Sequence, residues 1–381
     1  MRILQVCSYL YPALTYGGPA QMVYDLSKQL SSRNSVTIYT TDVWDQVRRI
    51  LKSEKINSTH NFHVKYFRNT FNALAFKIRF FTGFGMVFDF IKNNKTYDVV
   101  HIHDVFIIPQ LLIALLSIIL KKPLFWTPHG VLDPLRLKKK TAIKKALLPV
   151  SIYFLKKATQ VIAVSQKEAY DLKQLGLNNI VTIYNGVSKL SVEPTQKFSA
   201  LKNKDKITLL YIGKIHQQKG LKESLLALKK SRINAQFIIA GPDDGGKTEL
   251  ETIIANLDIK DVYFLGFVGE KEKKELYKIS DLFIHPSYAE GFSISILESM
   301  REGVPVVISD GCNFPEVENK NAGFIVRVSK LEKELSHLFK LVVKNKGLLN
   351  KMKEDAKRLV NTSYTTKVMA KKYEKLYEKH F

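Results

Sequence analysis

The chain has 381 residues, of which 45% are hydrophobic and 25% are charged, and its formal net charge is +24. This composition excludes a disordered protein, and the length predicts two domains of about 180 residues, each large enough to bury a core. The two cysteines, Cys7 and Cys312, fall in different predicted domains and therefore indicate a reducing compartment without a disulfide framework.

The chain opens with a predicted strand and not with a signal peptide. Residues 3–7 are mostly apolar, but the Tyr-Pro and Gly-Gly pairs that follow interrupt any signal-peptide core. The longest apolar run, 105–120, contains Pro109 and Gln110 and is shorter than the roughly 20 residues of a membrane-spanning helix. We therefore expect a buried helix at 105–120 and a cytoplasmic protein.

Short apolar segments alternate with helical patterns along both halves of the chain. In the first half the predicted strands are, in chain order, 3–7, 36–39, 64–67, 99–102, 124–126, 161–164 and 181–183. In the second half they are 208–212, 236–240, 262–264, 282–284 and 306–308, followed mainly by helix. This alternation predicts an α/β protein with parallel sheets and helices on both faces of each sheet.

A polar stretch separates the two halves. The Asn185-Gly186 pair predicts a turn, and residues 188–205 are polar and show no periodicity. We therefore place an N-terminal domain at 1–187 and a C-terminal domain at 188–365. The last segment, 366–381, has apolar residues at helical spacing, which predicts a helix.

Two carboxylates, Glu290 and Glu298, stand eight positions apart around a predicted strand-loop-helix junction. In a parallel sheet such a loop lies at the carboxyl ends of the strands, where ligands bind. The backbone N–H groups of Ser293 and Ile294 are expected to open the helix and hold phosphate, between Glu290 in the loop and Glu298 inside the helix. A nucleotide sugar matches this layout, because its diphosphate lies between two polyols. The alternative is a first-turn charge and a solvated helix face.

A second candidate phosphate site is the glycine-bounded turn 213–220, G-K-I-H-Q-Q-K-G, which follows the predicted strand 208–212. Lys214 and Lys219 lie in this strand-to-helix turn, where cations and free N–H groups can meet a pyrophosphate. The turn is not a Walker loop, because Lys219 precedes its glycine. A basic turn on a basic protein is the alternative interpretation.

Taken together, these motifs resemble the retaining GT-B glycosyltransferases of family 4. In the second half, the family's ordered features are matched by Gly213-Lys214, Lys219-Gly220, Glu290-Gly291-Phe292, Glu298, 303–307 (G-V-P-V-V) and 314–317 (F-P-E-V). In the first half, they are matched by Tyr16-Gly17-Gly18, 101–104 (H-I-H-D) and 127–130 (T-P-H-G). Lys214 stands where the family more often has Arg, so bidentate phosphate recognition is lost there, and Ser293 stands where many members have Gly.

The resemblance implies a GT-B fold, in which two Rossmann-like doubly wound domains face each other across a cleft and helix 366–381 packs back on the first domain. It also implies a retaining glycosyltransferase that moves a sugar from a UDP- or GDP-linked donor to a glycan or lipid-linked acceptor, in bacterial surface polysaccharide synthesis. We expect no cofactor, and no divalent metal ion, because the sequence contains no Asp-x-Asp motif and no cluster of His and Cys at ligand spacing.

The resemblance further assigns roles to individual residues. The expected donor-binding residues are Gly17, Gly18, Lys214, Lys219, Glu290, Phe292, Ser293, Ile294 and Glu298. The expected catalytic residues are His129, Lys219 and Glu290, with His103 and Asp104 as weaker candidates. The two lysines neutralise the leaving diphosphate, Glu298 binds the ribose, and Glu290 binds the transferred sugar. His129 meets the sugar or the acceptor, although a capping histidine in a turn is the alternative.

Basic and aromatic residues are concentrated in the first half. Residues 136–157 contain eight Lys or Arg and no acid, and seven phenylalanines lie within residues 71–90. At least half of these phenylalanines are expected in the core. The others, with the basic run, predict a peripheral protein on the anionic inner face of the cell membrane. A solvated face is the alternative interpretation.

Two other classes of protein stay open. One is a nucleotide-sugar epimerase or a phosphorylase of similar shape, although the sequence shows neither an extra acid-base pair nor a lysine in a pyridoxal context. The other is a basic nucleic-acid-binding protein, which leaves the glycine turns and the Glu pair unexplained. We expect no nucleic-acid partner, because the sequence contains no nucleic-acid-binding motif.

Overall fold

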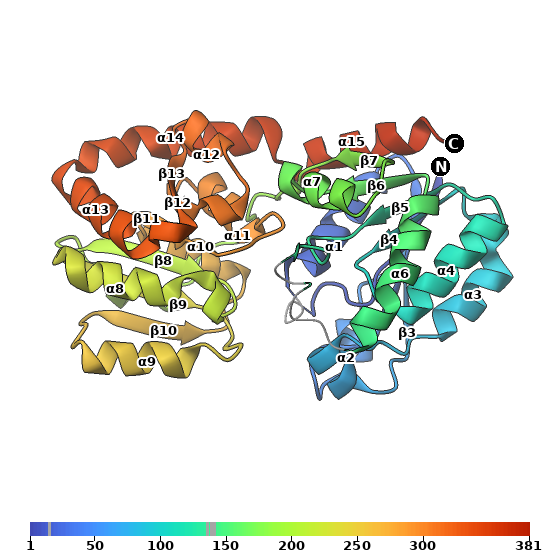
Figure 1. Cartoon of the computed structure of the whole chain (residues 1–381), viewed down its shortest axis with the longest axis horizontal. Coiled ribbons are helices and arrows are strands. Elements are labelled where there is room, and N and C mark those ends of the chain that lie inside the picture. The colour runs from blue at the N-terminus through green and yellow to red at the C-terminus, as the bar shows by residue number, and fades with distance from the viewer. Residues whose placement is uncertain (14–16, 135–136, 138–141) are drawn as a thin grey trace. The chain divides into compact units, whose positions relative to one another are not determined.

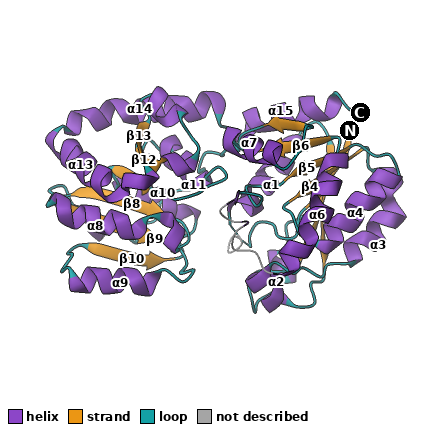
Figure 2. Cartoon of the chain, viewed as in Figure 1, coloured by secondary structure: helices purple, strands orange, loops and turns teal. Residues whose placement is uncertain are grey.

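A computed structural model of the chain describes residues 1–13, 17–134, 137 and 142–381. It divides into two compact units. The first unit comprises Met1–Gly186 together with Thr366–Phe381, and the second comprises Val187–Thr365. The division predicted from the sequence falls one residue later, after 187. Each unit is built on one sheet with helices packed against it (Figure 1; Figure 2).

The sheet of the first unit is parallel throughout. Its strands are β1 (Arg2–Val6), β2 (Ser35–Thr41), β3 (Phe62–Phe67), β4 (Val99–His103), β5 (Leu124–Thr127), β6 (Gln160–Ala163) and β7 (Ile180–Thr182). Their order is β3-β2-β1-β4-β5-β6-β7, so the direction of winding reverses between β1 and β4. The helices are α1 (Gly18–Leu30), α2 (Asn72–Ile78), α3 (Gly85–Asn93), α4 (Ile108–Ile119), α6 (Ala142–Lys157), α7 (Gln166–Gln174) and α15 (Thr366–Glu378).

Two apolar layers sandwich this first sheet, because successive residues of a strand face opposite sides. Leu4 and Val6 of β1 belong to the core beneath α3, α4 and α6, whereas Ile3 belongs to the core beneath α1 and α15. Helix α15 packs beside α1 and buries Tyr373 and Tyr377 completely. The C-terminal helix is therefore part of the first unit, as its apolar spacing requires.

The sheet of the second unit is also parallel. Its strands are β8 (Ile207–Ile212), β9 (Ala235–Ala240), β10 (Val262–Gly266), β11 (Leu282–His285), β12 (Val306–Ser309) and β13 (Gly323–Val326). Their order is β10-β9-β8-β11-β12-β13, with the reversal between β8 and β11. The helices are α8 (Leu221–Ser231), α9 (Lys247–Asn256), α10 (Glu270–Ile279), α11 (Ile294–Arg301), α12 (Glu316–Asn319), α13 (Leu331–Lys344) and α14 (Lys346–Ser363).

Helices cover both faces of this second sheet as well. Leu282 and Ile284 of β11 join the core formed with α8, α9 and α13, whereas Phe283 faces Tyr277 of α10 on the other side. The predicted class, two Rossmann-like doubly wound domains, is confirmed. Strand β13 is not predicted from the sequence, because it is short and begins with Gly323, a weak strand former. A Cβ at Gly323 would approach the carbonyl oxygen of Val306 to 2.1 Å, so close pairing with β12 requires glycine.

The apolar run at 105–120 contains α4. The sequence predicts that this helix is buried, but one side of it is exposed. Leu112, Leu115 and Ile119 are exposed on one side of it, while Ile113 and Ala114 lie in the core. Within the described part of the chain, no helix combines the length and the apolar character that a membrane crossing requires.

Candidate active site

Two turns of the second unit meet at the carboxyl ends of β8 and β11, the neighbouring strands at which the winding reverses. The turn 213–220 follows β8, and the loop 286–293 follows β11. They are bonded to each other, since the backbone N–H of Tyr288 and the hydroxyl of Ser287 both donate to the carbonyl of Gln218, at 2.8 and 3.0 Å. This position is where open α/β sheets bind their ligands.

Glycine is required where these segments touch. Gly220 has φ +68°, and a Cβ there would lie 2.2 Å from the carbonyl oxygen of Pro286. A Cβ at Gly311 would lie 2.5 Å from the carbonyl oxygen of Tyr288. Gly311 in turn accepts the backbone N–H of Glu290 at 2.9 Å, which fixes the position of that residue. Any larger residue at either glycine would displace the loop that carries Glu290.

Lys219, Glu290 and His285 form one charged group at this junction. The Lys219 ammonium forms an ion pair with Glu290 Oε1, and His285 Nε2 donates to the same oxygen at 2.8 Å. Only 11% of the Glu290 side chain and 20% of the Lys219 side chain are exposed. Burial opposes ionisation of Glu290, but the Lys219 charge and the His285 hydrogen bond outweigh it and hold the pKa of Glu290 well below its usual range. Glu290 is therefore a carboxylate that can only accept hydrogen bonds.

Glu298 lies in α11 and is held from α10. Lys273 Nζ contacts its two carboxylate oxygens at 3.2 and 2.9 Å, and the Tyr277 hydroxyl donates to Oε2 at 3.2 Å. The side chain is only 10% exposed. Glu298 is thus fixed by two partners that the sequence analysis did not identify, because α10 and α11 are separated by strand β11.

The start of α11 lies between the two carboxylates in sequence. Ser293 is the residue before the helix, its side chain caps no helical N–H, and its hydroxyl lies 3.1 Å from that of Ser295. Ile294 is the first helical residue, and the first turn contains no acid. The first N–H groups of α11 are therefore directed at the site without a competing acidic side chain in that turn, as an anion requires.

The remaining donor-binding candidates of the second unit, Phe292 and Lys214, differ in the burial of their side chains. The Phe292 side chain is buried and packs on the rings of Phe314 and Tyr364, with centroids 4.8 and 5.7 Å away, so its side chain belongs to the core and only its backbone borders the loop. Lys214 is partly exposed, and its carbonyl accepts the Tyr211 hydroxyl at 2.8 Å.

In the first unit, Gly17 and Gly18 form the start of α1, which follows β1. Gly17 has φ 112° and ψ −172°, a conformation essentially restricted to glycine, and it directly precedes the helix that begins at Gly18. Tyr16 of the same motif lies outside the described residues. Asp104 follows β4 and accepts the Tyr9 hydroxyl at 2.8 Å. The first unit thus has its own polar groups at the reversal between β1 and β4.

His129 follows β5 in an uncommon backbone conformation. Its φ is +58°, which lies in the left-handed region that non-glycine residues rarely adopt. The next residue, Gly130, donates its N–H to Glu168 at 2.5 Å, and Glu168 also accepts the N–H of Val164 at 2.7 Å. This carboxylate holds the turn in place. Burial lowers the pKa of His129 to about 4, against an opposing effect of Asp104, so its ring is neutral at neutral pH.

His129 belongs to a buried polar cluster. His129 Nε2 lies 3.1 Å from His103 Nδ1, and His103 Nε2 lies 2.7 Å from Gln5 Oε1. His101 Nδ1 lies 2.7 Å from the Tyr377 hydroxyl of α15, and His101 Nε2 lies 2.8 Å from Thr127 Oγ1. The weaker candidate His103 is therefore in contact with His129. The motif 101–104 identified the histidines, but no sequence signal identified Gln5 or Tyr377.

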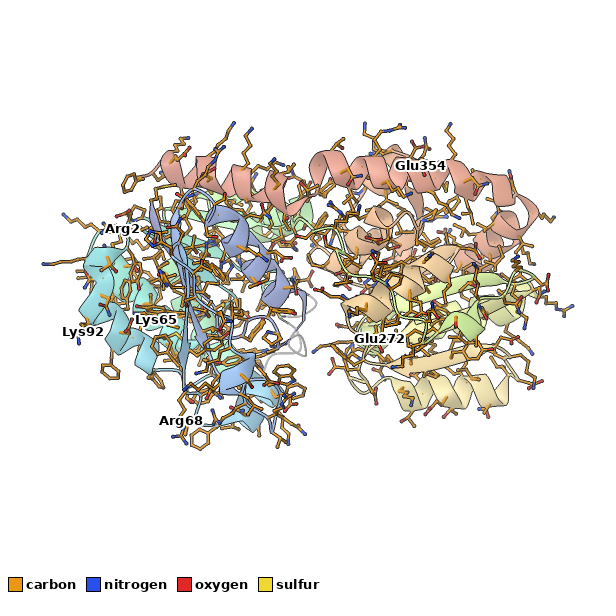
Figure 3. The ribbon with its side chains drawn as sticks, turned by 180° about the vertical axis from the view of Figure 1, so that it is seen from behind. Arg2, Lys65, Arg68, Lys92, Glu272 and Glu354 are labelled. Carbon is orange, nitrogen blue, oxygen red and sulfur yellow. The ribbon has the colours of Figure 1, made fainter. Side chains whose placement is uncertain are left out.

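The exposed side chains of α3, α4 and α6 form a surface that we call the α3–α4–α6 face. Its exposed apolar residues are Phe84, Phe88, Ile91, Leu112, Leu115, Ile119, Leu120, Ile143, Val150 and Tyr153. Exposed lysines on and beside these helices are Lys92, Lys95, Lys121, Lys145, Lys156 and Lys157; Lys92 extends away from the ribbon (Figure 3). Within the described helices α3, α4 and α6, Asp89 is the one acidic residue, and Lys65 engages it at 2.9 Å.

The residues that form the α3–α4–α6 face differ from those predicted from the sequence. Of the phenylalanines in 71–90, Phe81 and Phe90 are buried, while Phe71, Phe84 and Phe88 are exposed. Arg136 and 138–140 of the predicted basic run lie outside the described residues. Helix α4, which the sequence predicts to be buried, contributes exposed apolar residues to this face beside those of α3 and α6.

Comparison with known proteins identifies the chain. A family model described as Glycosyltransferase Family 4 matches residues 16–189, and one described as Glycosyl transferases group 1 matches residues 192–359. An uncharacterized glycosyltransferase of Methanocaldococcus jannaschii is 30% identical over 233 residues, 58% of this chain and 60% of the relative. An N,N'-diacetylbacillosaminyl-diphospho-undecaprenol alpha-1,3-N-acetylgalactosaminyltransferase of Campylobacter jejuni is 30% identical over 236 residues, 58% of this chain and 61% of the relative. The chain thus spans about three fifths of the length of these two relatives.

The fold agrees with solved structures. The crystal structure of Anabaena HepE in complex with UDP and glucose aligns with 100% of this chain over 100% of its own length. The TM-score is 0.78 and the sequence identity is 20%. The two parallel, doubly wound sheets with flanking helices therefore form the GT-B fold. The chain belongs to the group 1 glycosyltransferases. The resemblance seen in the sequence is confirmed for the family and the fold, whereas retention of configuration stays a prediction.

Proposed function

We propose that this glycosyltransferase moves a sugar from a UDP- or GDP-linked donor to a glycan or lipid-linked acceptor, with retention of anomeric configuration, in bacterial surface polysaccharide synthesis. The observation that carries the proposal is the Lys219–Glu290 ion pair beside the start of α11, where the winding of the second sheet reverses. Two comparisons support it: the Campylobacter jejuni relative is named for a diphospho-undecaprenol-linked substrate, and HepE was solved with UDP and glucose.

The donor diphosphate binds at the start of α11, with Lys219 and Lys214 as counter-charges. Oxygen atoms of a diphosphate accept hydrogen bonds from backbone N–H groups and from ammonium groups, and both kinds of donor are present at this junction. When the bond between the anomeric carbon and the diphosphate oxygen breaks, negative charge grows on that oxygen. Lys219 stabilises this charge more strongly in the transition state than in the bound donor. We propose that these groups neutralise the diphosphate without a divalent metal ion.

The two carboxylates bind hydroxyl groups on either side of the diphosphate. Glu290 is ionised and accepts a hydrogen bond from a hydroxyl of the transferred sugar. Glu298, oriented by Lys273 and Tyr277, accepts hydrogen bonds from the ribose. Because Glu290 carries no proton at neutral pH, it acts by binding and orientation and not as a general acid. His129 contributes a neutral imidazole that contacts the transferred sugar or the acceptor.

The α3–α4–α6 face suits a lipid-linked acceptor. A bilayer accommodates exposed apolar side chains such as Phe88 and Ile119, while the surrounding lysines attract anionic headgroups. We commit to an anionic bilayer as the occupant of this face. Lysines dominate its charged residues, and Asp89, the one acidic residue in the described parts of α3, α4 and α6, is already paired.

The test is release of nucleoside diphosphate from a panel of UDP- and GDP-linked sugars, measured with the parent protein and with Glu290→Gln. We expect slow hydrolysis of at least one donor by the parent and a large loss in the variant. Glu354→Gln in α14, where the side chain is 69% exposed, is the matched control, with parental rates expected. Absence of release across the panel, or recovery of an isomerised donor, contradicts transfer.

A further inference from the structure

The buried amide of Gln5 determines which nitrogen of His103 carries the proton. Gln5 lies on β1 and is fully buried. Its Oε1 lies 2.7 Å from His103 Nε2, a typical length for an imidazole N–H donated to an amide oxygen. The amide nitrogen points the other way and donates to the Tyr377 hydroxyl at 3.4 Å. Because an amide oxygen can only accept, the proton of this bond is on His103 Nε2.

The proton on His103 in turn sets the proton on His129. A neutral imidazole with its proton on Nε2 leaves Nδ1 as an acceptor. His103 Nδ1 lies 3.1 Å from His129 Nε2, so His129 donates from Nε2. Both rings are buried, and they stack with centroids 5.3 Å apart. Burial, the first cause of the low pKa of each ring, keeps both neutral.

The second imidazole nitrogen of His129 is therefore an acceptor. Within the described part of the chain, Nδ1 of His129 makes no hydrogen bond. The ring has a fixed direction, because the turn that carries it is held at φ +58° by the carboxylate of Glu168. The two ring nitrogens of His101 are in hydrogen-bond contact with Thr127 of β5 and with Tyr377 of α15.

We infer that Gln5 and His103 are positioning residues, which hold His129 in the tautomer protonated at Nε2 so that its Nδ1 lone pair accepts a hydrogen bond from a hydroxyl group of the sugar or the acceptor. This inference rests on the role of His129 in the proposed function. It adds that a hydroxyl donor, and not an anionic oxygen, is the partner of His129. An anion would need the opposite tautomer or a charged ring.

The direct test needs no variant. Long-range ¹H–¹⁵N correlation spectra of the parent protein labelled at its histidines distinguish protonation at Nε2 from protonation at Nδ1. Site assignment uses His103→Asn and His129→Asn. We expect both His103 and His129 as neutral rings protonated at Nε2 at neutral pH. A ring protonated at Nδ1, or a charged ring, at either position overturns the inference.

Removal of the amide oxygen tests the consequence for the reaction. In Gln5→Leu, His103 loses its acceptor, so we expect mixed tautomers at His129 and a fall in kcat of roughly 10-fold, as the loss of about one positioned hydrogen bond would give. Donor affinity should change little, because Lys219, Glu298 and the start of α11 are untouched by this substitution. Gln5→Glu restores an acceptor and should recover part of the lost kcat.

The matched control is Gln110→Leu. Gln110 is an equally buried amide of the first unit, and it donates to the Ser8 hydroxyl at 3.3 Å, which is not part of the histidine cluster. It should retain parental tautomers and kcat. If Gln5→Leu keeps full kcat while the parent turns over donor, the positioning role is wrong and the proposed function stands. If the parent turns over no donor, the proposed function fails, whatever the spectra show.

Discussion

Lys219 and Glu290, which lie in different turns of the second unit, form an ion pair, and Glu290 also accepts a hydrogen bond from His285. Each charge is largely removed from water, so each depends on the other for its solvation. A diphosphate that binds Lys219 would share the ammonium with Glu290. The pair thus joins the phosphate-binding turn to the loop that meets the sugar, and changes to either residue should affect both stability and transfer.

Replacement of Lys219 by Met should lower both the free energy of unfolding and the rate of transfer. The variant leaves an ionised, buried Glu290 without its ammonium partner, at a cost of about 3 kcal/mol. It also removes the counter-charge of the leaving diphosphate. The double variant Lys219→Met with Glu290→Gln should regain most of the stability and none of the activity. Chemical denaturation and donor hydrolysis are the measurements.

The control for Lys219 is Lys222→Met, which breaks an exposed pair with Glu249 at 3.0 Å. It should change neither quantity appreciably. Full hydrolysis by the stable double variant would show that Lys219 acts on stability alone.

Replacement of Glu298 by Gln should weaken the binding of UDP or GDP by roughly 10–100-fold, because the ribose loses a charged acceptor. Glutamine keeps the shape of the side chain and an acceptor for Tyr277, so the fold should survive. Calorimetric titration with the nucleoside diphosphate measures the change. Glu302→Gln, one turn further along the chain, is the control and should bind as the parent does. Undiminished affinity in Glu298→Gln would remove the ribose role.

The general plan of the sheets could be predicted from the sequence, because strands buried on both faces are short apolar runs. The glycine-bounded turn 213–220 and the Glu290–Glu298 spacing also predict the junction in the second unit. The partners of these residues could not be predicted. Lys273 contacts Glu298 across 25 positions, and Gln5 contacts His103 across 98, so only the three-dimensional pairing of elements brings them together.

Surface assignments failed for a related reason. The run 105–120 is apolar on nearly all sides, which predicts burial, yet one side of α4 is exposed beside α3 and α6. Hydropathy indicates which residues avoid water but not whether the protein itself or a partner covers them. The buried His101, His103 and His129 are the converse case, since the burial of a polar side chain depends on hydrogen-bond partners that lie far away in the sequence.

Acidification should destabilise the first unit before the carboxylates titrate. The pKa values of His101, His103 and His129 are lowered by burial, that of His129 to about 4, whereas histidine in an unfolded chain titrates near 6.5. Below pH about 6.5 the unfolded chain binds protons that the native protein does not, so stability falls with pH by up to about 1.4 kcal/mol per pH unit for each such histidine.

Guanidinium unfolding at pH values from 7.5 to about 4.5, chosen to span the two pKa ranges, measures this slope. His101→Gln should reduce the slope over that window, while His337→Asn, at an exposed position of α13, should leave it unchanged. Identical slopes in the parent and in His101→Gln would contradict a neutral buried His101.

Chelation should leave activity intact. Among the described residues, no group of three or more His, Cys, Asp or Glu side chains is arranged to hold a metal ion, and the proposed neutralisation of the diphosphate uses Lys214, Lys219 and the start of α11. Donor hydrolysis is measured with EDTA in excess and again after Mg²⁺ or Mn²⁺ is restored. Loss of turnover in the chelator with recovery on addition of the ion would assign the neutralisation to a metal.

The α3–α4–α6 face should bind anionic vesicles in a salt-dependent manner. Each lysine near an anionic surface contributes about 1 kcal/mol to the binding free energy, and salt screens this contribution. Insertion of exposed apolar side chains adds a contribution to the binding free energy that salt does not remove. Phe88 and Ile119 are 71% and 64% exposed, so Phe88→Ser with Ile119→Ser should weaken binding with little effect on the fold. Co-sedimentation with vesicles containing phosphatidylglycerol, and with neutral vesicles, is the measurement.

The matched control for this face is Phe267→Ser, because Phe267 is 58% exposed in the second unit, outside the proposed face. It should bind vesicles as the parent does. Lys156→Gln with Lys157→Gln should reduce the salt dependence and leave the residual, salt-resistant binding in place, which separates the electrostatic contribution from the apolar one. Equal co-sedimentation of the parent and of both double variants, or none for the parent at low salt, would leave the face as an ordinary solvated surface. The lipid-linked acceptor would then have to reach the enzyme by another route.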